Sequence, residues 1–138
     1  MGLAETAVGQ NKATKEQLMA ADLVIMQDMG SAAASDMARF CIEHRIPYIV
    51  EFDDFVHHVS PRNLGGYNAW HPGTLYIHRA MEQARAAFAV QVSTPQLARE
   101  YFPYNPTVFV VPNYLDREAW THLKANRNDG KIRIGWAG

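Results

Sequence analysis

The stretch "AFAVQVSTPQLAREY", at residues 87–101, contains a complete strand, a turn and a helix. Its first six residues are apolar or small with one glutamine, which is typical of a strand. Ser93 or Thr94 can then cap a helix whose first turn contains Pro95. A strand that leads directly into a helix is the building unit of α/β sheets.

The same alternation of strand and helix occurs upstream. "LVIMQ" at residues 23–27 is a short apolar run suited to a strand that is covered on both faces. Ser31 can cap a helix that extends to about His44, and "YIVEF" at 48–52 forms the next strand after Pro47. Helical spacing predicts that five residues share one face of this helix: Ala33, Met37, Phe40, Cys41 and His44.

Two further strands are predicted downstream. A helical pattern begins at Thr74, and four apolar residues share one face of it: Ile77, Met81, Ala84 and Phe88. "TVFVV" at 107–111 is a fourth strand, a short helix follows at 116–120, and "KIRIGW" at 131–136 is a fifth strand. Between the second strand and Thr74, residues 53–73 show no sustained period, and we interpret them as a functional loop.

Strands that alternate with helices pair in parallel through right-handed crossovers, which predicts an open, parallel, Rossmann-like α/β sheet flanked by helices. Ligands of such sheets bind beyond the carboxyl ends of the strands, where loop amides and helix N-termini converge. Eight polar or glycine residues follow the predicted strands at this edge: Asp28, Asp53, Asp54, Ser93, Thr94, Asn113, Gly135 and Gly138.

Composition excludes several classes of function. The 138 residues suffice for one compact domain, and no apolar run approaches the roughly 20 residues of a membrane-spanning helix. The formal net charge is -1 with scattered basic residues, which argues against nucleic acid as a partner. Cys41 is the only cysteine, and no secretory signal is visible, so we expect a cytoplasmic location.

Four segments follow one another in an informative order. They are "YIVEFDDF" at 48–55 before a long loop, "AFAVQVSTPQLAREY", "VFVVPNYLDREAW" at 108–120, and "IRIGWAG" at 132–138 after a polar linker. This order resembles the middle of a GT-B glycosyltransferase of the family 4-like group. The resemblance implies an incomplete N-terminal, acceptor-side domain followed by the first strand of the nucleotide-sugar-binding domain.

The resemblance also implies a function for the complete enzyme. It would transfer a sugar, with retention of configuration and without a metal ion, from a nucleotide sugar to a hydroxyl of a glycan, lipid-linked or protein acceptor. No cofactor beyond the nucleotide-sugar donor is implied, and peripheral attachment to a membrane is compatible with the family. The donor domain is missing from this sequence, so we expect the isolated chain to be catalytically inactive.

This interpretation divides the chain into four parts. Thr14 and Gln17 carry a capping-box pattern, which marks the start of the first helix and of the folded region. The expected parts are a flexible N-terminal arm at 1–13, a partial acceptor-side domain at 14–124, an interdomain linker at 125–130, and the first strand of the truncated donor domain at 131–138.

The adjacent acids Asp53 and Asp54 form the strongest candidate site. One carboxylate could position an acceptor hydroxyl or take its proton as a general base. The alternative is that a carboxylate caps the following loop by accepting backbone N–H bonds. His57 is the nearest histidine and a third catalytic candidate. Histidines here lack metal-ligand spacing, so we expect no metal site.

The remaining candidates each have a structural alternative. Asp28, Gly30 and Ser31 could bind the acceptor through turn amides, or simply begin a helix. Ser93 and Thr94 could contact the acceptor, or cap the next helix. Three residues could bind the donor or act at the interdomain hinge: Asn113, Gly135 and Gly138.

A different class of function fits the same sequence. The chain could be a non-enzymatic Rossmann-like module that binds a carbohydrate or a partner protein through an exposed sheet edge. The two hypotheses differ in whether a donor-binding domain works together with this chain.

Overall fold

The computed structural model describes residues 13–27, 30–114 and 118, and for His57 only the backbone. Several predictions therefore lie outside the described residues. They concern residues 1–12 of the arm predicted at 1–13, the helix at 116–120 apart from Glu118, the linker at 125–130, the strand at 131–136, and the site residues Asp28, Gly135 and Gly138.

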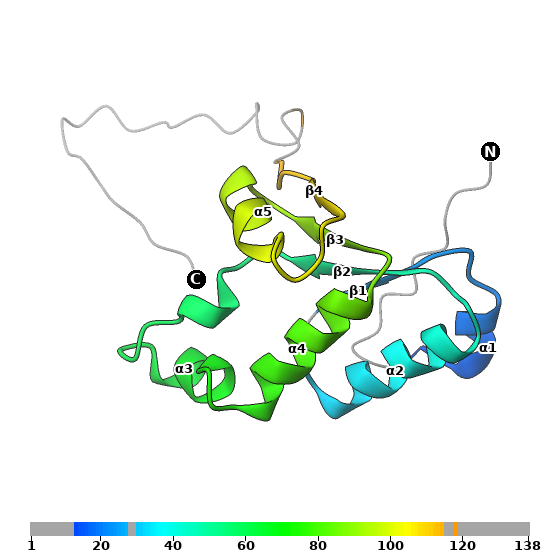
Figure 1. Cartoon of the computed structure of the whole chain (residues 1–138), viewed down its shortest axis with the longest axis horizontal. Helices are drawn as coiled ribbons and strands as arrows, with labels where there is room; N and C mark the ends of the chain where they lie inside the picture. Colours follow the sequence, from blue (N-terminus) through cyan, green and yellow to red (C-terminus); the bar gives the residue numbers. More distant parts are fainter. Residues whose placement is uncertain (1–12, 28–29, 115–117, 119–138) are drawn as a thin grey trace.

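The described strands form one four-stranded sheet. They are β1 (Val24–Met26), β2 (Tyr48–Phe52), β3 (Ala89–Val92) and β4 (Val108–Val110). The strands lie side by side in the order β1-β2-β3-β4, and every neighbouring pair is parallel (Figure 1). This confirms the prediction of an open, parallel α/β sheet.

Helices connect the strands, as the alternating pattern predicts. They are α1 (Lys15–Met19), α2 (Ala32–Glu43), α3 (Leu64–Trp70), α4 (Leu75–Ala86) and α5 (Pro95–Tyr101), with a short 3-10 turn, η1 (Val56–His58). The caps predicted at Thr14, Ser31 and Thr94 are present, because these side chains accept backbone N–H bonds at the starts of α1, α2 and α5. Thr74 caps α4 in the same way. Each cap satisfies an N–H group that has no partner inside its helix.

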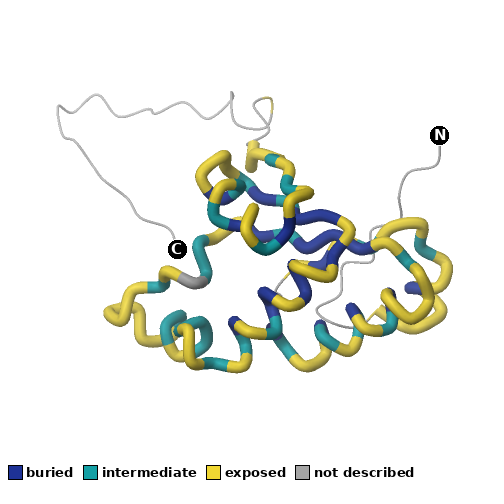
Figure 2. Tube along the Cα trace, in the orientation of Figure 1, coloured by how far each residue is buried: buried dark blue, intermediate teal, exposed yellow. Residues whose placement is uncertain are grey.

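Among the described residues, the main hydrophobic cluster lies against one face of the sheet. One residue from each strand forms a row across this face: Met26, Val50, Val90 and Val108 are partners in register. These residues pack into one cluster with buried residues of α1, α2, α4 and α5 (Figure 2). Because right-handed crossovers that step in one direction place every helix on the same side, the strand order explains this helix-covered face.

The first strand corrects one expectation. We expected residues 23–27 to be covered on both faces, but Ile25 is 55% exposed while its neighbour Met26 is buried. Ile25, Ile49 and Ala89 are partners in register, so they share the face that points away from the core cluster. No helix of the described residues contributes to a core there. We call this the opposite face of the sheet.

Three details of the helices also differ from expectation. The region 53–73 is not a single loop, because η1 and α3 lie within it. In α2 the buried stripe contains Ala34 and Ala38, whereas Ala33 and His44 are exposed. Helix α4 ends before Phe88, whose side chain is exposed. Regular spacing locates a helix well, but the neighbouring elements decide which adjacent stripe is buried.

Two buried polar residues were not predicted by any pattern. Asn105 donates hydrogen bonds to the carbonyls of Ala84 and Ala87, both at 2.9 Å, and accepts one from the backbone of Thr107. It thereby ties the end of α4 to the start of β4. Gln83 in α4 donates to the hydroxyl of Ser35 in α2 at 2.7 Å, which links these two helices.

Candidate functional site

The carboxyl ends of β2, β3 and β4 carry the predicted polar residues at one edge of the sheet. Asp53 follows β2, Ser93 follows β3, and Asn113 lies shortly after β4. The three strands are parallel, so these ends lie at the same edge. The sequence prediction that these groups share one edge is confirmed, and we call it the carboxyl rim.

Hydroxyl groups of β3 and α5 hold the backbone of the acidic pair. The Ser93 hydroxyl donates to the carbonyl of Asp53 at 3.2 Å, and the Tyr101 hydroxyl donates to the carbonyl of Asp54 at 3.2 Å. Tyr101 is fully buried, and its ring stacks on Phe52 with centroids 4.2 Å apart. Burial raises the pKa of Tyr101, so its hydroxyl remains a proton donor. Both acidic side chains are exposed.

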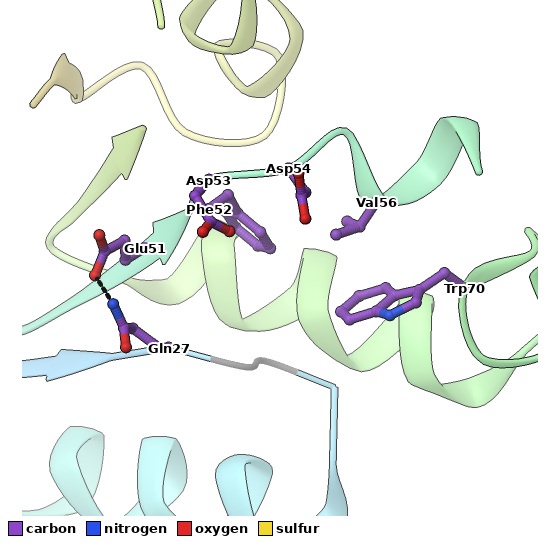
Figure 3. Close-up of a pocket in the computed structure, with 7 residues that line it drawn as sticks. All are labelled: Gln27, Glu51, Phe52, Asp53, Asp54, Val56 and Trp70. Carbon is purple, nitrogen blue, oxygen red and sulfur yellow. Dashed lines mark hydrogen bonds between the residues drawn. The ribbon is translucent and has the colours of Figure 1, made fainter. Parts of the chain in front are cut away.

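The first hollow at the rim, which we call the rim pocket, has a volume of about 330 Å³. Its polar lining consists of Gln27, Glu51, Asp53 and Asp54, and its apolar lining of Phe52, Val56 and Trp70 (Figure 3). The side-chain amide of Gln27 donates a hydrogen bond to the Glu51 carboxylate across β1 and β2. This volume lies at the lower end of the range typical of small-ligand sites.

A second hollow of about 350 Å³ lies on the α5 side of the acidic pair. It is lined by Asp53, Asp54, Phe55, Thr94, Gln96 and Leu97. The Thr94 hydroxyl accepts the backbone N–H of Leu97 at 3.2 Å, which is the capping role anticipated as the alternative for this residue. The acidic pair therefore stands between two hollows and can reach ligands in both.

The turn after β1 has a clear packing function. Gly30 is buried with a φ of 115°, and a Cβ atom there would lie 2.4 Å from the ring of Tyr76. Only glycine fits this conformation and this close approach. Ser31 caps α2 by accepting the N–H of Ala34 at 3.1 Å. Capping and packing account for both residues, and a role in acceptor binding stays a prediction.

Ser93 and Asn113 do not line either hollow, and the side chain of His57 lies outside the described part of the chain. Asn113 is exposed. Among the described residues, no group of three His, Cys, Asp or Glu side chains could hold a metal ion. Within the same part of the chain, no helix is long and apolar enough to cross a membrane.

Sequence reasoning missed four residues that shape this site. Gln27 and Glu51 are the polar residues of strands that the sequence predicts as otherwise apolar. Because their sequence neighbours are buried, strand alternation could have indicated that both side chains point away from the core. Trp70 belongs to a helix that the sequence did not predict. Tyr101 was placed at the end of a helix, but its bond to Asp54 joins residues 47 positions apart.

Comparison with known proteins does not assign this chain to a family. No family model matches the chain, and no curated protein is similar to it at a significant level.

Proposed function

We propose that this chain is the acceptor-side part of a GT-B-type glycosyltransferase, in which the acidic pair of the carboxyl rim receives the acceptor hydroxyl. One observation carries the proposal. Asp53 and Asp54 stand exposed at the carboxyl rim, between two hollows, on a backbone that Ser93 and Tyr101 hold in place. Open parallel sheets bind their substrates at this edge.

The proposed chemistry follows from the carboxylates. One of them accepts a hydrogen bond from the acceptor hydroxyl and takes its proton while the new glycosidic bond forms. The bond between the donor sugar and its diphosphate breaks in the same process, on the face of the sugar where the new bond forms, and the nucleoside diphosphate leaves with the bonding electrons. In this proposal a nucleotide-sugar-binding domain holds the donor, and the residues of the carboxyl rim hold the acceptor.

The resemblance in segment order also suggests the finer features of this function. The enzyme would act on hexosyl donors, retain the anomeric configuration and need no metal ion. Helix dipoles and basic side chains of the donor domain would then stabilise the leaving diphosphate. A cytoplasmic enzyme with a glycan or lipid-linked acceptor fits this scheme.

A transfer assay tests the proposal. The full-length protein is incubated with a panel of labelled nucleotide sugars and glycan acceptors, and the product is measured by chromatography. We expect Asp53→Asn or Asp54→Asn to lower kcat by about 10² to 10⁴ fold, the usual contribution of a general base. Ser93→Ala, which loosens the backbone of the pair, should have a smaller effect.

The competing function is a binding module. It is favoured by the exposed apolar residues Ile25 and Phe109 on the opposite face of the sheet, which are 55% and 37% exposed. No transfer from any nucleotide sugar would favour this second function. Unchanged transfer in both aspartate variants would instead refute the role of the acidic pair.

A further inference from the structure

The rim pocket is polar at one end and apolar at the other. Figure 3 shows Gln27 and Glu51 on one side and Val56 and Trp70 on the other, with Asp53 and Asp54 above them. A sugar ring has the same division, because its hydroxyls project from the edge while its axial C–H groups form an apolar face. The two ends of the pocket therefore match the two kinds of surface on a sugar.

The apolar end is built around a fixed aromatic ring. Trp70 is partly buried against the core, and the edge-to-face contact with Tyr76 places the two ring centroids 4.5 Å apart at 82°. The face of an indole ring carries partial negative charge, which attracts the slightly positive C–H groups of a sugar. A tryptophan fixed in this way loses little freedom when a ligand binds.

The polar end offers hydrogen-bond acceptors. The carboxylates of Glu51, Asp53 and Asp54 can only accept hydrogen bonds when ionised, and sugar hydroxyls can donate them. Such charge-assisted bonds are stronger than bonds between neutral groups. The bond from Gln27 keeps the Glu51 side chain beside β1, at the polar end of the pocket.

The charge of the lining limits which sugars can enter. Three of the seven described lining residues are acidic, and none of these seven is Lys, Arg or His. A phosphate or carboxylate on the ligand would meet like charges at short range, and the lining residues that the structure describes offer no cation to offset them. An uncharged ring meets no such repulsion.

We propose that the rim pocket binds an acceptor sugar that carries no negative charge, with its C–H face on Trp70 and its hydroxyls toward the three carboxylates. This inference names the acceptor class, and it rests on the proposed transferase function. It also assigns Trp70 and Glu51 as ligand contacts, in addition to the acidic pair.

The test measures ligand binding directly, without transfer. The purified chain is titrated with methyl glucoside, glucosamine and glucose 6-phosphate, and binding is followed by saturation-transfer NMR. We expect methyl glucoside and glucosamine to bind at least about fivefold more tightly than glucose 6-phosphate, because like charges a few ångströms apart repel by about 1 kcal/mol even in water. Salt at 0.5 M should reduce this difference in affinity, because it screens the repulsion between the phosphate and the carboxylates.

Variants test which residues contribute to sugar binding. Trp70→Leu should abolish the glucoside signal, and Trp70→Phe should retain part of it, because a phenyl ring still offers an aromatic face. Phe88→Leu is the control, since Phe88 is an exposed aromatic residue at the opposite end of β3. Glu51→Gln should bring the affinity for glucose 6-phosphate closer to that for methyl glucoside.

The outcomes separate this inference from the proposed function. Equal binding of glucose 6-phosphate, or full glucoside binding by both Trp70 variants, would overturn the inference even if the transfer assay succeeds. Selective glucoside binding that depends on Trp70, in a protein without transferase activity, would support the pocket and refute the enzyme.

Discussion

The two faces of the sheet differ in what their side chains contact. On the helix-covered face, Val50, Val90 and Val92 are almost completely buried beneath the helices. On the opposite face, Ile25 and Phe109 are exposed at its two sides. Between them, Ile49 and Ala89 are buried but lie outside the main hydrophobic cluster. Alternation along each strand sends successive side chains to different faces, so one strand takes part in both environments. The comparison shows that the core depends on one face, while the polar residues Gln27 and Glu51 belong to the other.

The largest expected effect comes from the same substitution placed on each face of β3. Val90→Lys would bury an unpaired charge in the core, and we expect it to cost more than about 4 kcal/mol and to prevent folding. Gln91→Lys places the lysine opposite Glu51 in register, on the other face. It should change the free energy of unfolding by less than about 0.5 kcal/mol. Urea denaturation followed by circular dichroism measures both.

Equal destabilisation by the two lysines would contradict the assignment of the faces. It would mean that both sides of β3 are packed against other groups.

An intermediate effect concerns Tyr48, which is buried on the helix-covered face and donates a hydrogen bond to the carbonyl of Gln83 at 3.1 Å. Burial raises the pKa of Tyr48 to about 12, compared with about 10 for an unfolded tyrosine. The folded state therefore keeps this proton between pH 10 and 12, while the unfolded state loses it. The stabilisation is complete below pH 10 and falls by up to about 1.4 kcal/mol per pH unit above it.

Comparison with Tyr48→Phe isolates this effect. At pH 9 the variant should be less stable by about 1 kcal/mol, the usual contribution of a lost hydrogen bond. Between pH 10 and 12 the difference should shrink and then reverse, as measured by urea denaturation at each pH. Tyr114→Phe, a change at an exposed tyrosine, should follow the wild type throughout. A constant difference between the wild type and Tyr48→Phe would contradict the assigned pKa.

The smallest expected effect concerns the opposite face. Ile25 and Ile42 are 55% and 54% exposed, on β1 and on the outer surface of α2. Ile25→Thr and Ile42→Thr should each change the free energy of unfolding by less than about 1 kcal/mol. Thermal denaturation and sedimentation velocity would measure stability and assembly. A large loss at Ile25 alone, with a change in molecular mass, would show that another surface covers the opposite face.

The limits of sequence reasoning are clearest at the acidic pair. Strand alternation and the turn after residue 52 predicted that Asp53 and Asp54 follow a strand, and parallel pairing predicted that they share a rim with Ser93. The contact between Tyr101 and Asp54 was not predictable, because no local pattern links residues so far apart. The same reason explains why Trp70 was missed as a neighbour of the pair.

The sequence by itself determined the strands, the capped helix starts and the parallel α/β class, because these depend on residues a few positions apart. Thr14, Ser31 and Thr94 cap their helices as their positions indicate. Only the tertiary structure decided that all crossovers step in one direction, so that one face holds the core and Ile25 lies outside it. It also brought Trp70 beside the acidic pair, since long-range packing decides which distant elements meet.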